Sequence, residues 1–146
     1  DHNGHMNVAY YLLAFDECVG ELFDYMGLTH AYRREQRAGT FVGDFHIQYV
    51  RELMQGDPFR VEHQIVDCDS KRIHFCQAMF QADEGYLAAR SEVISLHMDM
   101  NQRRVSPMPD AMFEHISNIR EAHSTLPRPT NQGRTIGIKI PNNNNT

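Results

Sequence analysis

The first pattern along the chain is a run of apolar residues at alternating steps of four and three. It starts after Asn7, ends before Gly27, and consists of Val8, Leu12, Phe15, Val19, Leu22 and Met26. This spacing places one stripe of an α-helix against a core. Asn7 is a suitable N-cap, and Gly27 suits the left-handed residue that often follows a helix. We therefore predict a buried helix of about five turns.

Alternating residues then predict strands. From Phe41 to Leu53 one face carries Phe41, Gly43, Phe45, Ile47 and Tyr49, whereas Asp44 and His46 lie on the other. We expect the apolar face to lie on the long helix. Further strands are predicted over 59–68, 73–81 and 86–100, separated by turn residues. The last of these is apolar on both faces, which is typical of a central strand.

The remaining segments complete an α+β chain. The charged run Arg33–Arg37 fits a helical turn or a solvated loop, and we favour the loop. After Pro109 we predict a short helix from Asp110 to His115 or beyond, capped by Asp110, with an apolar side of Met112, Phe113 and Ile116. Prolines and glycines interrupt the chain from Arg120 onward. We therefore expect one domain over 1–119 and a tail over 120–146, either mobile or draped over a neighbour.

Composition excludes several classes of protein. The 146 residues carry a formal net charge of −5, which argues against a nucleic-acid partner. No apolar run is long enough to cross a bilayer, so we expect no membrane partner. Three cysteines without metal spacing read as reduced thiols of a cytoplasmic protein. Asp1, His2 and His5 lack a second ligand pair elsewhere, so we expect no metal.

Candidate chemistry lies at the start of the chain. The first N–H groups of a helix have no internal partner and carry partial positive charge, which stabilises a developing oxyanion. Asp1 lies just upstream, joined by Asn3-Gly4. A carboxylate beside a polarised carbonyl can act as general base on water or as nucleophile, as hydrolysis of an activated acyl group requires. An aspartate at this spacing also reads as a turn residue.

The opening motif Asp-x-x-Gly-His-x-Asn, followed by Phe15-Asp16-Glu17, resembles the hotdog-fold acyl-CoA thioesterases of the 4-hydroxybenzoyl-CoA thioesterase type. The resemblance extends from Asp1 to about Ile116. It implies one long central helix wrapped by a curved antiparallel sheet, with a pocket between two protomers. It also implies that Asp1 is the catalytic carboxylate and that amides near Val8 and Ala9 polarise the thioester carbonyl.

Other residues of the motif have two readings each. His5 and Asn7 belong to the catalytic motif by resemblance, but they also read as capping or core residues. Asp16 matches a position near the family's pocket, or it is a solvated helix residue. Tyr10, Tyr11 and Phe15 line an acyl pocket, or part of this set is core.

The resemblance also bears on the substrate and assembly. Coenzyme A would enter as part of an acyl-CoA substrate, so no separate cofactor is expected. Its phosphates would need cations, for which Lys71-Arg72 and Arg103-Arg104 are candidates beside plain surface charge. The likeness around Gly4 to Glu17 is greatest to thioesterases of carnitine and betaine breakdown, which would act on betainyl-CoA. We expect a homodimer or a tetramer of dimers, because sheet edges would otherwise be exposed.

Two other functions remain open. Hotdog dehydratases or hydratases use a histidine with an acid from the central helix, and here His5 precedes the helix while Glu17 lies deep in it. A non-catalytic acyl-CoA-binding or oligomerisation module is the other alternative. The family comparison further suggests that a strand upstream of Asp1 is missing from the numbered chain.

Overall fold

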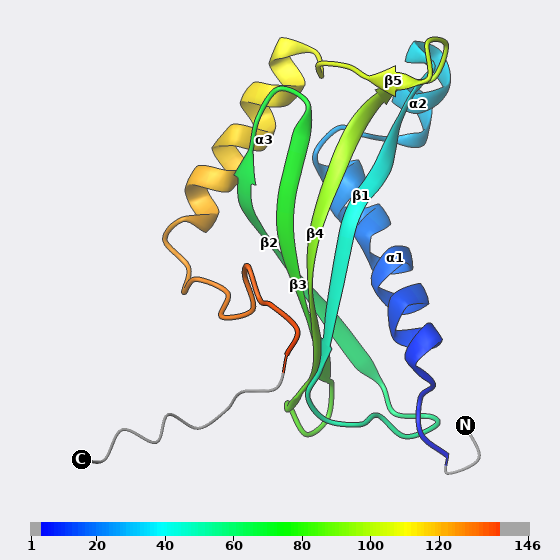
Figure 1. Cartoon of the computed structure of the whole chain (residues 1–146), viewed down its shortest axis with the longest axis vertical. Coiled ribbons are helices and arrows are strands. Elements are labelled where there is room, and N and C mark those ends of the chain that lie inside the picture. The colour runs from blue at the N-terminus through cyan, green and yellow to red at the C-terminus, as the bar shows by residue number, and fades with distance from the viewer. Residues whose placement is uncertain (1–3, 138–146) are drawn as a thin grey trace.

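A computed structural model describes residues 4–137 and shows one antiparallel sheet wrapped around a long helix (Figure 1). In chain order the elements are α1 (Val8–Tyr25), α2 (His30–Gln36), β1 (Ala38–Tyr49), β2 (Phe59–Cys68), β3 (Arg72–Gln81), β4 (Leu87–Asp99), β5 (Arg104–Val105) and α3 (Asp110–His123). The predicted α+β hotdog arrangement, with its long central helix, is confirmed.

The four long strands follow the order β1-β4-β3-β2, and every neighbouring pair is antiparallel. β4 lies between β1 and β3, as its apolar residues on both faces predicted. The short β5 pairs with Met98 and Asp99 at the end of β4 and was not predicted, because two residues leave no alternating pattern. Among the described strands, β1 forms one long edge of the sheet.

A β-bulge at Gly43 changes the predicted faces of β1. Val42 pairs with Ser95 and Asp44 pairs with Ile94, so one residue of β1 is left over. Because side chains alternate, the extra residue moves every earlier side chain to the opposite face. The prediction that Phe41 lies on the helix face is therefore wrong: Val42 shares that face with Phe45, and Phe41 is 61% exposed on the other.

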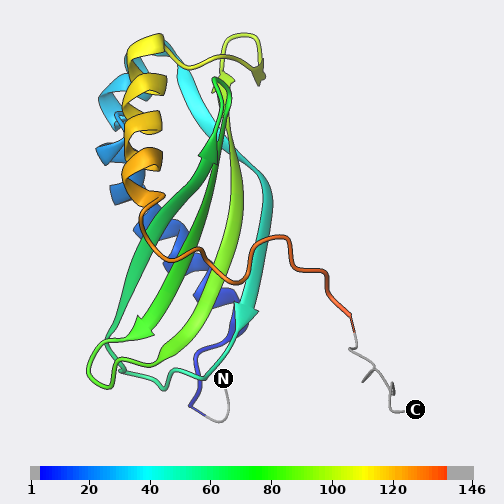
Figure 2. The ribbon, with the colours of Figure 1, turned by 90° about the vertical axis from the view of Figure 1, so that its left-hand side faces the viewer.

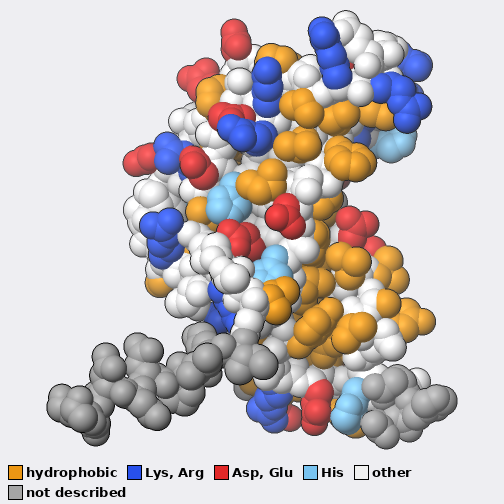
Figure 3. All heavy atoms as spheres, in the orientation of Figure 1, with side chains coloured by type: hydrophobic (Ala, Val, Ile, Leu, Met, Phe, Trp, Pro, Cys, Tyr) orange, Lys and Arg blue, Asp and Glu red, His pale blue; other side chains and the backbone are white. Residues whose placement is uncertain are grey.

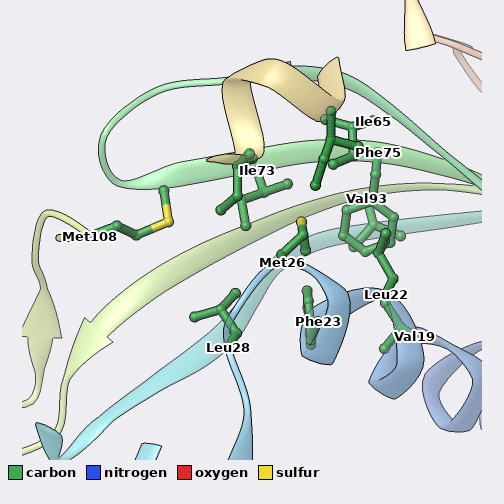
Figure 4. Packing of buried hydrophobic residues seen from close by; sticks show 12 residues of the cluster. Val19, Leu22, Phe23, Met26, Leu28, Ile65, Ile73, Phe75, Val93 and Met108 are labelled. Carbon is green, nitrogen blue, oxygen red and sulfur yellow. The ribbon is translucent and has the colours of Figure 1, made fainter. Parts of the chain in front are cut away.

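The main core lies between the second half of α1 and the sheet (Figure 4). Val19, Leu22, Phe23 and Met26 of α1 pack on Ile65, Ile73, Phe75 and Val93 of the strands. The rings of Phe23 and Phe75 meet edge to face, with centroids 6.1 Å apart. α3 contributes Ile116 and Ile119 to the same cluster. This packing fixes α1 against the concave side of the sheet.

The first half of α1 does not follow the predicted stripe. Its buried residues are Tyr11, Ala14 and Phe15, which form a second cluster with Leu53 and Met79. Val8 is 59% exposed and Leu12 is 45% exposed, so the predicted burial of these two residues is wrong. The helix therefore turns part of its apolar surface outward near its start.

The two other helices also differ from expectation. The charged run is helical up to Gln36, and Arg37 ends α2 in the left-handed conformation. Thr29 caps α2 by accepting from the Tyr32 N–H at 3.1 Å. α3 begins after Pro109 without any side-chain cap, so the predicted capping by Asp110 is wrong. α3 is also longer than the short helix we expected, and it continues to His123, beyond residue 119.

The segment after α3 crosses the face of the sheet that is turned away from α1 (Figure 2). The Asn131 amide donates to the Ser91 carbonyl at 3.1 Å, and the Gly133 N–H donates to Glu92 Oε2 at 2.8 Å. The described part of the predicted tail therefore lies on the sheet of its own chain.

Candidate active site

The segment just before α1 is held by backbone pairing with the loop after β1. The Met6 N–H donates to the Leu53 carbonyl at 2.8 Å, and the Gln55 N–H donates to the Gly4 carbonyl at 2.9 Å. His5 and Met54 face each other in an isolated antiparallel bridge. Gly4 has a φ of 76°, which glycine adopts without strain. The described part of the motif, Gly4 to Asn7, is thus fixed at the entrance to α1.

The start of α1 confirms the predicted cap and distinguishes the two amides that the resemblance implicates. Asn7 Oδ1 accepts from the Ala9 N–H at 3.0 Å, so that amide is already committed. The Val8 N–H has no acceptor among residues 4–137. Val8 is 59% exposed, and the free N–H groups of a helix's first turn carry partial positive charge.

Four aromatic side chains lie in the first half of α1 or beside it, in different environments. The Tyr49 hydroxyl donates to the Val8 carbonyl at 3.4 Å, and its ring meets the Tyr11 ring edge to face at 5.3 Å. The Tyr11 hydroxyl accepts from the Leu53 N–H at 2.9 Å, and burial raises the pKa of Tyr11. Tyr11 and Phe15 belong to the second core cluster, whereas Tyr10 is exposed. Sequence reasoning missed Tyr49, because only the fold brings the end of β1 to the helix.

Acidic and basic side chains lie beside the motif. His5 Nδ1 is 3.9 Å from Glu52 Oε2, and the Glu52 carbonyl accepts from the Tyr86 hydroxyl at 2.8 Å. The Arg51 guanidinium stacks 3.7 Å from the centre of the Tyr86 ring. Glu52, Arg51 and Tyr86 come from loops that carry no motif in the sequence. Asp1 itself lies outside the described residues, so its catalytic role stays a prediction.

Asp16 is not next to the motif within one chain. It lies nine residues after Asn7, which corresponds to about 13 Å along a helix. Asp16 lines a cavity of about 220 Å³ together with Arg33 of α2 and Phe45 of β1. Within one chain Glu17 is likewise remote from His5.

The four cations expected to hold phosphates lie at the end of the molecule opposite to the start of α1. Figure 1 places the β2–β3 turn and the turn before β5 at the upper end, whereas α1 begins at the lower end. Arg72 is also paired, with its Nη2 2.6 Å from Asp69 Oδ2. The hydrogen bond from Arg72 lowers the pKa of Asp69. Lys71, Arg103 and Arg104 are exposed. A single chain therefore does not join these cations to the motif.

The described residues show neither a metal cluster nor a membrane-spanning helix. Between residues 4 and 137 no group of three His, Cys, Asp or Glu side chains is arranged to hold a metal ion. None of the helices described is both long and apolar enough to cross a membrane. Cys18, Cys68 and Cys76 form no disulfide.

Comparisons with known proteins place the chain in a family. The model of the thioesterase-like superfamily matches residues 1–116. A betainyl-CoA thioesterase of Pseudomonas aeruginosa is 30% identical over 138 residues, which cover 94% of this chain and 87% of the relative.

Two solved structures are also similar. A Staphylococcus aureus protein in complex with CoA is 29% identical, with a TM-score of 0.88 over 95% of this chain and 87% of its own. A putative thioesterase of Pseudomonas putida is 28% identical, with a TM-score of 0.81 over 96% and 89% of the two chains. The chain therefore belongs to the thioesterase-like superfamily and is a hydrolase of thioesters.

Proposed function

We propose that the protein hydrolyses acyl-CoA thioesters at the start of α1. The observation that carries this proposal is the exposed Val8 N–H, uncommitted among the described residues, at the positive end of an 18-residue helix directly after the motif. A thioester carbonyl that accepts from this amide becomes more electrophilic, and its oxyanion is stabilised. The relative named for betainyl-CoA hydrolysis and the S. aureus structure with CoA support acyl-CoA as the substrate class.

Asp1 supplies the carboxylate in this proposal, as the family motif implies. Either it removes a proton from water, or it attacks the thioester itself and the resulting anhydride is hydrolysed. In both routes the carbon–sulfur bond breaks. A general base directs a water oxygen to the acyl carbon, whereas hydrolysis of the anhydride at the Asp1 carbon leaves an Asp1 oxygen on the acyl product and a water oxygen in Asp1. Coenzyme A leaves as a thiolate, which takes up a proton. His5 and Asn7 act in support, since His5 pairs with Glu52 and Asn7 caps α1.

A second copy of the chain completes the site. Val8, Tyr10, Leu12 and Leu13 of α1 are exposed, as are Val42 and Tyr49 on the edge strand β1. Apolar side chains gather over this part of the molecule in Figure 3. Such a surface is typical of an interface, and a free sheet edge is normally covered. We therefore propose a homodimer in which the first halves of two α1 helices pack together.

The symmetry of such a dimer brings separated residues together. A two-fold axis at Leu12 would place Val8 of one α1 level with Asp16 of the partner subunit, because each lies four residues from Leu12. The same axis would bring the partner's upper end, with its Lys71-Arg72 and Arg103-Arg104, toward the lower end of this chain. Asp16 and these cations would then contribute to a pocket shared by two protomers.

Release of free thiol from acyl-CoA tests the proposal. Betainyl-CoA is the first substrate to try, because of the P. aeruginosa relative. Asp1→Asn should lower kcat by about a hundredfold or more, since general-base catalysis contributes that much. Asp24→Asn, an exposed acid at the other end of α1, is the matched control and should leave kcat unchanged.

Two results would count against the proposal. Unaltered turnover in Asp1→Asn would remove Asp1 from the mechanism, and absence of thiol release from any acyl-CoA would remove the activity. Turnover in isotopically labelled water separates the two roles of the carboxylate, because only a nucleophilic Asp1 acquires the label in its side chain.

A further inference from the structure

The cavity beside Asp16 has the features of a pocket for a small organic group. It measures about 220 Å³ and lies between α1, α2 and β1. Phe23, Phe45 and Phe75 form apolar walls, and Asp16 and Arg33 are the charged residues that line it. At Gly20, which also lines the cavity, a side chain would meet nothing within 4 Å. The cavity is therefore open along α1.

Arg33 lines the cavity and carries a hydrogen-bond donor without an acceptor in the described part of the chain. Its Nε is buried and has no acceptor among the residues that the structure describes. The guanidinium carbon lies 5.4 Å from the centre of the Phe23 ring, which holds the side chain in place. A buried charged donor without an acceptor is costly, so a ligand that supplies an acceptor gains that energy.

Asp16 does not neutralise this donor. Within residues 4–137 the two side chains form no ion pair across the cavity. Asp16 is exposed, so water and salt screen its charge, whereas Arg33 is partly buried. The preference of the cavity for one sign of charge is therefore set by Arg33, and it favours an anion or a neutral acceptor.

We infer that Arg33 selects acyl groups that end in a hydrogen-bond acceptor, above all a carboxylate. This inference rests on the proposed function, because it takes the cavity to hold the acyl end of a thioester whose carbonyl lies at the Val8 amide of the partner subunit. A planar guanidinium pairs well with a carboxylate oxygen. A quaternary ammonium, as in the substrate named for the P. aeruginosa relative, would meet a positive charge here.

Four acyl-CoA substrates in two matched pairs test the inference. Glutaryl-CoA and valeryl-CoA have equal chain lengths, but only glutaryl ends in a carboxylate. Betainyl-CoA and 3,3-dimethylbutyryl-CoA have the same shape, but only betainyl is positive. The wild-type protein should show a higher kcat/KM for glutaryl-CoA than for valeryl-CoA. Arg33→Met should reduce that ratio about ten- to hundredfold, the effect of one hydrogen bond to a charged group.

Two further variants serve as controls. Arg34→Met removes the same charge from the next, exposed position of α2 and should keep the wild-type ratio. Arg33→Lys keeps the charge without the planar fork and should keep part of the ratio. Unchanged circular dichroism and melting temperature would show that each variant is folded.

The outcomes separate this inference from the proposed function. Equal glutaryl-to-valeryl ratios in wild type and Arg33→Met would overturn the role of Arg33 while leaving hydrolysis intact. A wild-type preference for betainyl-CoA over its neutral isostere would also overturn it. Release of no thiol from any of the four substrates would overturn the proposed function and this inference together.

Discussion

The two halves of α1 carry similar apolar residues but use them differently. In the second half Leu22 is 8% exposed and packs into the main core, whereas in the first half Leu12 is 45% exposed. The sequence pattern treats both leucines as members of one stripe. The difference arises because Leu28 and residues of α3 complete the core cluster around the second half, whereas no described residue buries the outer side of the first half.

This contrast separates residues that stabilise the chain from residues that build the site. Apolar surface buried within one chain contributes to folding, at about 25 cal/mol per Å². Apolar surface left outside contributes only when a partner or ligand covers it. The outward-facing residues lie at the same end of α1 as the motif and the exposed Val8 amide, where a shared pocket would need them.

Truncation of Leu22, compared with truncation of Leu12, is expected to give the largest change in the free energy of unfolding. Leu22→Ala should lower the free energy of unfolding by about 2–5 kcal/mol, because a cavity replaces a buried side chain. Leu12→Ala should lower it by less than about 1 kcal/mol, since water already reaches this position. Urea unfolding at a protein concentration well below the dissociation constant of the proposed dimer measures both changes in the single chain.

The same pair of variants also reports on assembly. Leu12→Ala should raise the dissociation constant of the proposed dimer, as measured by sedimentation equilibrium, whereas Leu22→Ala should not when folded. If Leu12→Ala cost as much unfolding free energy as Leu22→Ala, the two halves of α1 would not differ in role. A wild-type protein that sediments as a monomer at micromolar concentration would remove the partner from the explanation.

A buried polar chain holds α1 to the sheet between the two halves. Gln77 Nε2 donates to the Phe15 carbonyl at 3.1 Å, and the Ser91 hydroxyl donates to Gln77 Oε1 at 2.7 Å. Asn131 donates to the Ser91 carbonyl from the far face of the sheet. Gln77→Leu should lower the free energy of unfolding by about 1–3 kcal/mol, because the buried Ser91 hydroxyl loses its acceptor.

A double-mutant cycle sharpens this prediction. Ser91→Ala in the Gln77→Leu background removes the orphaned hydroxyl, so the two changes together should cost less than their sum. Gln81→Leu is the matched control: it is a buried glutamine of the same strand that accepts only from the Glu84 N–H in an exposed turn. Strict additivity of the two substitutions in urea unfolding would contradict a coupled network.

Local patterns predicted most elements but not the faces that tertiary contacts decide. The strands over 59–68 and 73–81 lie within one residue of their predicted bounds, because turn residues bracket them. The bulge at Gly43 escaped prediction, since a glycine fits either face of an alternating pattern. Asn7 was identified as a cap because capping is local. Arg33 was assigned to a solvated run, because only the packing of α2 on α1 places it at a cavity.

The smallest expected effect is a pH dependence at the junction of the two halves. His63 of β2 lies beside the backbone of Cys18 and near Glu21. Burial lowers the pKa of His63 below its ordinary value of 6.5, and the hydrogen bond to Cys18 only partly opposes this shift. The unfolded chain therefore takes up a proton at a higher pH than the folded chain does. Stability is unaffected above pH 6.5 and is lost as the pH falls below that value.

Replacing His63 should therefore flatten the acid side of the stability curve. His63→Gln cannot gain the proton, so its free energy of unfolding should fall less steeply between neutral and mildly acidic pH than that of the wild type. Burial also lowers the pKa of His123, so part of the slope should remain. His30→Gln, at an exposed position, is the control and should keep the wild-type slope. Parallel curves for His63→Gln and wild type in urea unfolding would show that the junction between the halves of α1 does not respond to protonation of His63.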